Sequence, residues 1–128
     1  MEPLLNGLSL IFLDPFNIML IFIGVLVGVV IGALPGLSSP MAVALLLPFT
    51  IGLEPIPAIA MLASLYCAGT FGGSITAILI NAPGAPPAVA TAFDGYPMAK
   101  RGEAGRALGM AAVSSVCGGV FSLVIFLL

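Results

Sequence analysis

The chain has 128 residues, of which 61% are hydrophobic and only 6% are charged, and its formal net charge is −2. Because a soluble domain carries about 25% charged residues, so few charges cannot cover a water-exposed surface, and the sequence predicts an integral membrane protein. The three basic residues are too few for the basic patch that nucleic-acid binding requires. A chain of this length has room for about four or five spans of roughly 20 residues each.

Residues 1–15 form a lead-in to the first apolar run. Their apolar side chains follow helical spacing, and Asp14-Pro15 is a start signal for the next helix. A helix lying on the membrane surface and a disordered tail both fit this segment. Residues 16–34 then predict the first span, because a helix of that length reaches about 28 Å, close to the thickness of the hydrocarbon layer.

A row of small residues runs along this first span. Gly24, Gly28 and Gly32 recur at every fourth position and therefore share one helix face. Such a face allows the backbone of another helix to approach closely. We therefore interpret the row as a packing device and not as a direct ligand contact.

The segment 35–40 interrupts the apolar pattern. Pro35 and Gly36 break the helix, while Ser38 and Ser39 can cap a new one. The run 41–53 that follows reaches only about 20 Å, which is short for a full crossing. It predicts either a re-entrant half-helix or a crossing completed by a non-helical stretch, and the break would then lie inside the membrane.

The next span, residues 58–82, repeats the small-residue row with Gly69, Gly73 and Ala77. Gly72 and Gly73 are adjacent in its middle, and each glycine weakens a helix by about 1 kcal/mol relative to alanine. The pair therefore predicts a local unwinding beside Ser74.

Polar residues and a helix stop follow. Thr76 and Asn81 precede Pro83-Gly84, which repeats the Pro35-Gly36 pair behind a glycine-rich helix. In lipid, a helix can be broken only where the break is buried in protein or lines a cavity. Two breaks in corresponding places are typical of a transport site. Because a buried amide is costly without partners, Asn81 either binds a ligand or caps the helix end.

All three basic residues lie within residues 88–106, so the positive-inside rule places this segment in the cytoplasm. Asp94-Gly95 is a turn signal, and we expect a loop here, with Asp94 as a turn residue in preference to an ion ligand. A cytoplasmic loop would put Pro83-Gly84 near the membrane surface. For a site deeper in the membrane, either residues 75–90 fold back, which we favour, or the unwinding at residues 72–74 forms the site.

Residues 107–128 predict a last span, with Ser114, Gly118 and Ser122 in another small-residue row. The sequence ends inside this apolar run, from which we expect a fragment of a longer protein. The predicted fold class is thus all-α: one domain of polytopic transmembrane helices with Pro/Gly-broken or re-entrant segments, with spans at about 16–34, 41–53, 58–82 and 107–128.

Four motifs together carry a family resemblance. They are Gly32-Ala-Leu-Pro-Gly-Leu37, Ala44-Leu-Leu-Leu-Pro48, Gly72-Gly-Ser-Ile-Thr-Ala-Ile-Leu-Ile-Asn-Ala-Pro-Gly84 and Thr91-Ala-Phe-Asp-Gly-Tyr-Pro97. The chain resembles the N-terminal part of the large membrane subunit of tripartite tricarboxylate transporters, the TctA-type permease. The resemblance implies a multi-pass permease of the bacterial inner membrane that takes up citrate or other carboxylates, driven by an ion gradient. It also implies two partners, a small membrane subunit and a periplasmic substrate-binding protein.

The candidate substrate- or ion-binding residues surround the two breaks. They are Pro35, Gly36, Ser38, Ser39, Gly72, Gly73, Ser74, Thr76, Asn81, Pro83 and Gly84. Backbone N–H groups at half-helix N-termini would hold a carboxylate, and a coupling Na⁺ or H⁺ would use freed carbonyls near Asn81. The chain has no His and no metal-ligand or catalytic spacing, so we expect no enzyme and no resident cofactor. The alternative is a packing fragment that cannot transport without a missing C-terminal part.

Overall fold

The computed structural model describes residues 2–128, and these residues contain helices and no strand. The helices are α1 (Glu2–Phe12), α2 (Pro15–Gly32), α3 (Ser39–Leu46), the 3₁₀ turn η1 (Leu47–Thr50), α4 (Pro55–Ile80), α5 (Ala88–Lys100) and α6 (Ala104–Leu127). Three of them, α2, α4 and α6, are long and apolar enough to cross a membrane. The all-α, multi-pass fold class is therefore confirmed.

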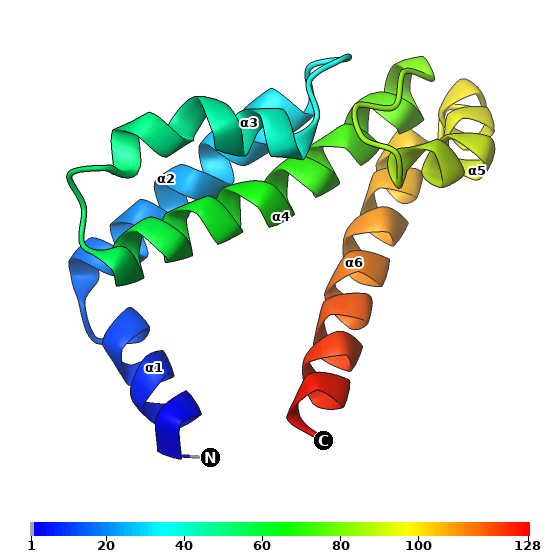
Figure 1. The fold of residues 1–128 in the computed structure, drawn as a ribbon. Coiled ribbons are helices and arrows are strands. Elements are labelled where there is room, and N and C mark those ends of the chain that lie inside the picture. The colour runs from blue at the N-terminus through cyan, green and yellow to red at the C-terminus, as the bar shows by residue number, and fades with distance from the viewer. Residues whose placement is uncertain (1) are drawn as a thin grey trace.

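Helices α2 and α4 pack side by side along the predicted glycine row (Figure 1). A methyl group added at Gly24 would lie 2.6 Å from the carbonyl oxygen of Met61, and one at Gly28 would lie 2.5 Å from that of Leu65. Gly32 in turn faces Gly69. Residue numbers rise together along both helices, so α2 and α4 run parallel, and the row is a packing seam as predicted.

Because α2 and α4 run parallel, the chain between them must return from the end of α2 to the start of α4. Helix α3 starts beside α4, where Ser39 lies against Gly69, and η1 continues it. Together they cover about 20 Å. Residues 52–54 then lie near the start of α2, because Leu53 and Glu54 line one cavity with Asp14. The return is therefore part α-helix, part 3₁₀ turn and part irregular chain, and its crossing of the membrane stays a prediction.

The predicted unwinding at Gly72-Gly73-Ser74 is wrong, because α4 is one continuous helix from Pro55 to Ile80. Both glycines serve as contact points instead. A methyl group at Gly72 would lie 2.6 Å from the carbonyl oxygen of Val29, and one at Gly73 would lie 3.0 Å from the backbone nitrogen of Ala85. Close packing on both sides thus outweighs the low helix propensity of the pair.

The predicted loop over residues 88–106 is also wrong, because Ala88–Lys100 forms helix α5. Ala88 and Ala92 are buried with Ala77 of α4. A methyl group at Gly95 would lie 2.6 Å from Cγ1 of Ile78, so this glycine permits close packing within a helix and makes no turn. The turn comes after α5, where Gly102 has φ +84°.

Helices α1 and α6 differ in their contacts with the rest of the structure. Residues 2–12 form a helix, in favour of the surface-helix interpretation over the disordered tail, and Asn17 Nδ2 of α2 donates to the carbonyl oxygen of Leu10 at 2.9 Å. Helix α6 contacts α5 and α4 near its start and then diverges from the other helices (Figure 1). Only Ala107 is buried along its length.

Candidate functional site

The second Pro-Gly loop packs against the end of α2, which is far from it in sequence. A methyl group at Gly84 would lie 2.6 Å from the carbonyl oxygen of Gly32 and 3.2 Å from Cα of Gly73. The end of α2, the C-terminal third of α4 and the loop after α4 therefore touch through glycine backbones. We call this contact of Gly32, Gly73 and Gly84 the glycine junction.

Asn81 turns the chain back toward this junction. It ends α4 in the left-handed conformation, with φ 56° and ψ 32°, and the N–H of Ala82 donates to the carbonyl oxygen of Thr76 at 3.3 Å. Asparagine tolerates this conformation better than most residues. From Ile80 the chain folds back to the level of Gly73, about 10 Å along α4. The chain after Asn81 thus folds back along α4, whereas residues 75–80 remain helical. A fold-back of residues 75–90 into the membrane stays a prediction, and Asn81 is the helix cap.

Ser39 is buried beside the junction. Its side chain is 2% exposed, and its Oγ lies 3.2 Å from Oγ1 of Thr70. Thr70 Oγ1 also donates to the carbonyl oxygen of Tyr66 at 3.0 Å. This hydroxyl pair ties the start of α3 to α4.

Only some of the predicted substrate- or ion-binding residues lie close together in the structure. Ser39, Gly72, Gly73 and Gly84 lie at or next to the glycine junction. The others are spread out: Pro35 and Gly36 are exposed on the first loop, Ser38 precedes α3, Thr76 bonds the carbonyl oxygen of Gly73, and Asn81 and Pro83 are exposed at the end of α4.

Ser74 lies on a different face of α4, in a cavity of about 400 Å³ between α4, α5 and α6. Thr91 and Asp94 of α5 and Ser114 and Ser115 of α6 also line it. The sequence interpretation did not group these residues. A usable signal was present, because Thr91 and Asp94 stand three residues apart and share a helix face once α5 is known to be a helix.

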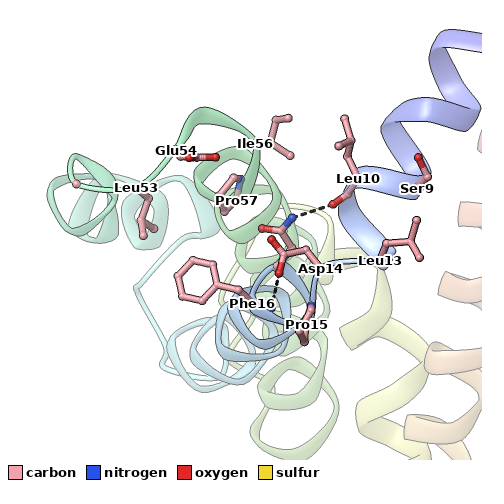
Figure 2. Close-up of a pocket in the computed structure, with 12 residues that line it drawn as sticks. Ser9, Leu10, Leu13, Asp14, Pro15, Phe16, Leu53, Glu54, Ile56 and Pro57 are labelled. Carbon is pink, nitrogen blue, oxygen red and sulfur yellow. Dashed lines mark hydrogen bonds between the residues drawn. The ribbon is translucent and has the colours of Figure 1, made fainter.

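A larger cavity, of about 740 Å³, opens at the other end of the bundle, at the starts of α2 and α4 (Figure 2). Asp14 caps α2 by accepting the N–H of Phe16 at 3.1 Å, while Glu54 precedes α4 without a side-chain cap bond. Both carboxylates are favoured there by the helix dipole. Asn17 Oδ1 is buried without a hydrogen-bond partner among the described residues.

Charge separates the two ends of the molecule. Asp14 and Glu54 lie at the starts of the parallel helices, whereas Lys100, Arg101 and Arg106 follow the far end of α4. This arrangement agrees with a cytoplasmic position for residues 100–106. Within residues 2–128, no group of three or more His, Cys, Asp or Glu side chains could hold a metal ion.

Most of the chain matches one known protein family. The model of the tripartite tricarboxylate transporter TctA family matches residues 18–128. A curated relative from Agrobacterium vitis, described as an uncharacterized 52.8 kDa protein in the TAR-I ttuC' 3' region, is 45% identical over 122 residues, which are 93% of this chain and 24% of the relative. The chain thus spans about a quarter of that relative's length. No solved structure gives a significant match. With most of its length matched, the chain belongs to the tripartite tricarboxylate transporter TctA family.

Proposed function

We propose that this chain forms part of the membrane permease of a secondary transporter in the bacterial inner membrane. The transporter takes up tricarboxylates or related carboxylates, driven by an ion gradient, and works with a small membrane subunit and a periplasmic substrate-binding protein. Family membership supports a transport component over a packing fragment without activity.

The observation that carries the proposal is the glycine junction. The loop after α4 folds back there against the end of α2 and against the intact helix α4, which resembles the way transporters assemble sites from broken helices. Helix α3 begins at Ser39 beside Gly69, and α5 begins at Ala88 beside Ala77, about 12 Å further along α4. Neither N-terminus has a side-chain cap bond.

Uncapped N-termini suit an anionic substrate. The first N–H groups of a helix have no partner within the helix, and the helix dipole favours negative charge near them. In α5 the N–H groups of Ala88 and Val89 already donate to the carbonyl oxygens of Ala85 and Pro86. A carboxylate would therefore be bound chiefly by backbone groups of α3, without any basic side chain. The described residues near the junction supply none, because all three basic residues lie beyond Ala99.

The test uses the full-length permease with both partner proteins, reconstituted in proteoliposomes that carry an ion gradient. Gly84→Ala places a methyl group against the backbone of Gly32. We expect citrate uptake to fall at least about tenfold, because a backbone contact cannot yield as a side chain does. Gly52→Ala is the matched control, since a methyl group there meets nothing within 4 Å. If the folded Gly84→Ala variant and the Gly52→Ala control take up citrate equally, the glycine junction does not contribute to transport.

A further inference from the structure

The cavity at the starts of α2 and α4 contains a buried hydrogen-bond acceptor without a donor. Asn17 of α2 lines this cavity and is only 5% exposed. Its Nδ2 donates to the carbonyl oxygen of Leu10, whereas its Oδ1 has no partner among the described residues. Because burying an amide oxygen without a hydrogen bond is costly, this oxygen indicates a donor from another molecule. We call this space the Asn17 cavity.

The backbone around the Asn17 cavity offers few donors. Proline has no N–H group, and both helices contain it in their first turns, at Pro15 of α2 and at Pro57 of α4. The N–H groups of Phe16 and Asn17 already donate to Asp14. These two helix starts, which would ordinarily attract an anion, therefore present mainly acceptors to the cavity.

The charged side chains of the lining are all acidic. Asp14 and Glu54 line the cavity, and no basic side chain joins them. Both carboxylates are exposed, so they supply negative charge and do not by themselves indicate a ligand. Together with the buried oxygen of Asn17, they favour a group that carries a positive charge and several N–H donors.

The rest of the lining is largely apolar. Leu10 and Leu13 stand on the side of α1, and Leu53 and Ile56 stand near the start of α4 (Figure 2). Helix α1 has no buried residue, so its leucines are open to the surroundings. Because α2 and α4 are long and apolar enough to span a membrane, a cavity at their first turns lies near the level of the lipid headgroups. An occupant with a cationic head and apolar chains matches both parts of the lining.

We propose that the Asn17 cavity binds a lipid with a primary ammonium headgroup, phosphatidylethanolamine. A primary ammonium group has three N–H donors, one for Asn17 Oδ1 and others for the carboxylates of Asp14 and Glu54, while the acyl chains cover the leucines. A choline headgroup carries the same positive charge without an N–H donor. A phosphatidylglycerol headgroup brings a net negative charge toward two carboxylates. The volume of about 740 Å³ holds the headgroup together with water molecules, at about 30 Å³ each, that hydrate its phosphate.

The test measures thermal unfolding of the purified full-length permease in detergent micelles as lipid is added. A ligand that binds only the folded state raises the unfolding temperature. We expect this rise with phosphatidylethanolamine and not with phosphatidylcholine or phosphatidylglycerol of the same acyl chains. Native mass spectrometry of the same samples should show phosphatidylethanolamine retained on the protein.

Variants of the lining locate the site. In Asn17→Leu, the half-saturating concentration of phosphatidylethanolamine should rise at least about tenfold, because a hydrogen bond from a charged donor contributes about that factor or more. Asp14→Asn and Glu54→Gln should each raise it about twofold to fivefold, since exposed ion pairs contribute little. Asparagine caps a helix as well as aspartate does, and the double variant keeps Asn17, so it decides the question if Asn17→Leu does not fold.

Two controls match these variants. Asn6→Ala removes an exposed amide of α1 outside the lining, and Asp94→Asn removes an exposed carboxylate of α5. Both should respond to phosphatidylethanolamine as the wild type does. The proposal is overturned if phosphatidylcholine stabilises the protein equally, if free ethanolamine alone gives the same shift, or if the Asn17 variant and the double variant respond like the controls.

A protein ligand gives a different result. If no lipid acts, and the double variant no longer co-purifies with the small membrane subunit or the binding protein, the lipid is rejected and the cavity binds a basic side chain of that partner. None of the lipid measurements depends on citrate uptake, so a permease that transports no carboxylate would leave the lipid site standing.

Discussion

The packing seam between α2 and α4 gives the sharpest prediction, which concerns Gly28→Ala. The added methyl group would lie 2.5 Å from the carbonyl oxygen of Leu65 and 2.9 Å from Cβ of Ala68. A normal contact needs about 3.5 Å, so the helices must separate locally by about 1 Å. Both neighbouring groups belong to a continuous helix or lie directly on it, and no side-chain rotation can relieve the clash.

The size of the effect follows from two opposing contributions. Overpacking of this kind costs about 1–3 kcal/mol. Replacing glycine by alanine within a helix contributes about 1 kcal/mol of stability in the other direction. We therefore expect Gly28→Ala to lower the free energy of unfolding by about 1 kcal/mol, with an upper limit of about 2 kcal/mol.

The assay is reversible unfolding of the full-length permease in mixed micelles, followed by circular dichroism. Gly7→Ala in α1 is the matched control, because a methyl group there meets nothing within 4 Å. That variant should be at least as stable as the wild type. A Gly28 variant as stable as the Gly7 variant would refute the close parallel packing of α2 and α4.

Three further predictions concern the cap, the hydroxyl pair and the topology. Asn81→Ala should destabilise the protein by about 1 kcal/mol in the same unfolding assay, while Asn81→Gly should not, because the left-handed conformation penalises a β-carbon. Ser39→Ala and Thr70→Ala should each cost about 1 kcal/mol, and their double variant should cost less than the sum; strict additivity would show that the 3.2 Å contact contributes nothing. In intact cells, a membrane-impermeant maleimide should label Gly52→Cys, and it should label Glu103→Cys only after permeabilisation. Labelling of both from outside would contradict opposite positions for the acidic and basic ends.

The sequence predicted helices well where the deciding property, such as hydropathy or length, belongs to a single segment. The apolar runs at residues 16–34 and 107–128 fall on α2 and α6 because hydropathy and length are properties of one segment. The glycine row of α2 was also readable, since residues spaced by four must share a face whatever the partner is. The sequence did not reveal that the partner is α4 in parallel orientation.

The sequence prediction was wrong for glycines whose conformation depends on packing against another segment. Gly72-Gly73 and Gly95 are weak helix formers by propensity, and from propensity alone they predicted an unwinding and a turn. In the fold both are helical, because Val29, Ala85 and Ile78 pack where side chains would stand. Propensity differences of about 1 kcal/mol are readily overridden by such packing.

For the candidate sites too, the sequence indicated individual residues, whereas the tertiary structure showed which of them lie together. The sequence placed Pro-Gly breaks behind two glycine-rich helices and named Ser39, Gly73 and Gly84 among the candidates. Only the tertiary structure brings Gly84 against Gly32, and only it sets Ser74 in one cavity with Asp94 and Ser114.

By itself, the sequence determined that this protein is a set of apolar helices interrupted at two Pro-Gly loops. Hydropathy, chain length and backbone preference are local, so each segment carries them. The tertiary structure decided where the second Pro-Gly loop packs and which glycines remain helical. These outcomes depend on the register of α2, α4, α5 and α6 against one another, because a glycine or a hydroxyl acquires its role from the atoms of another helix.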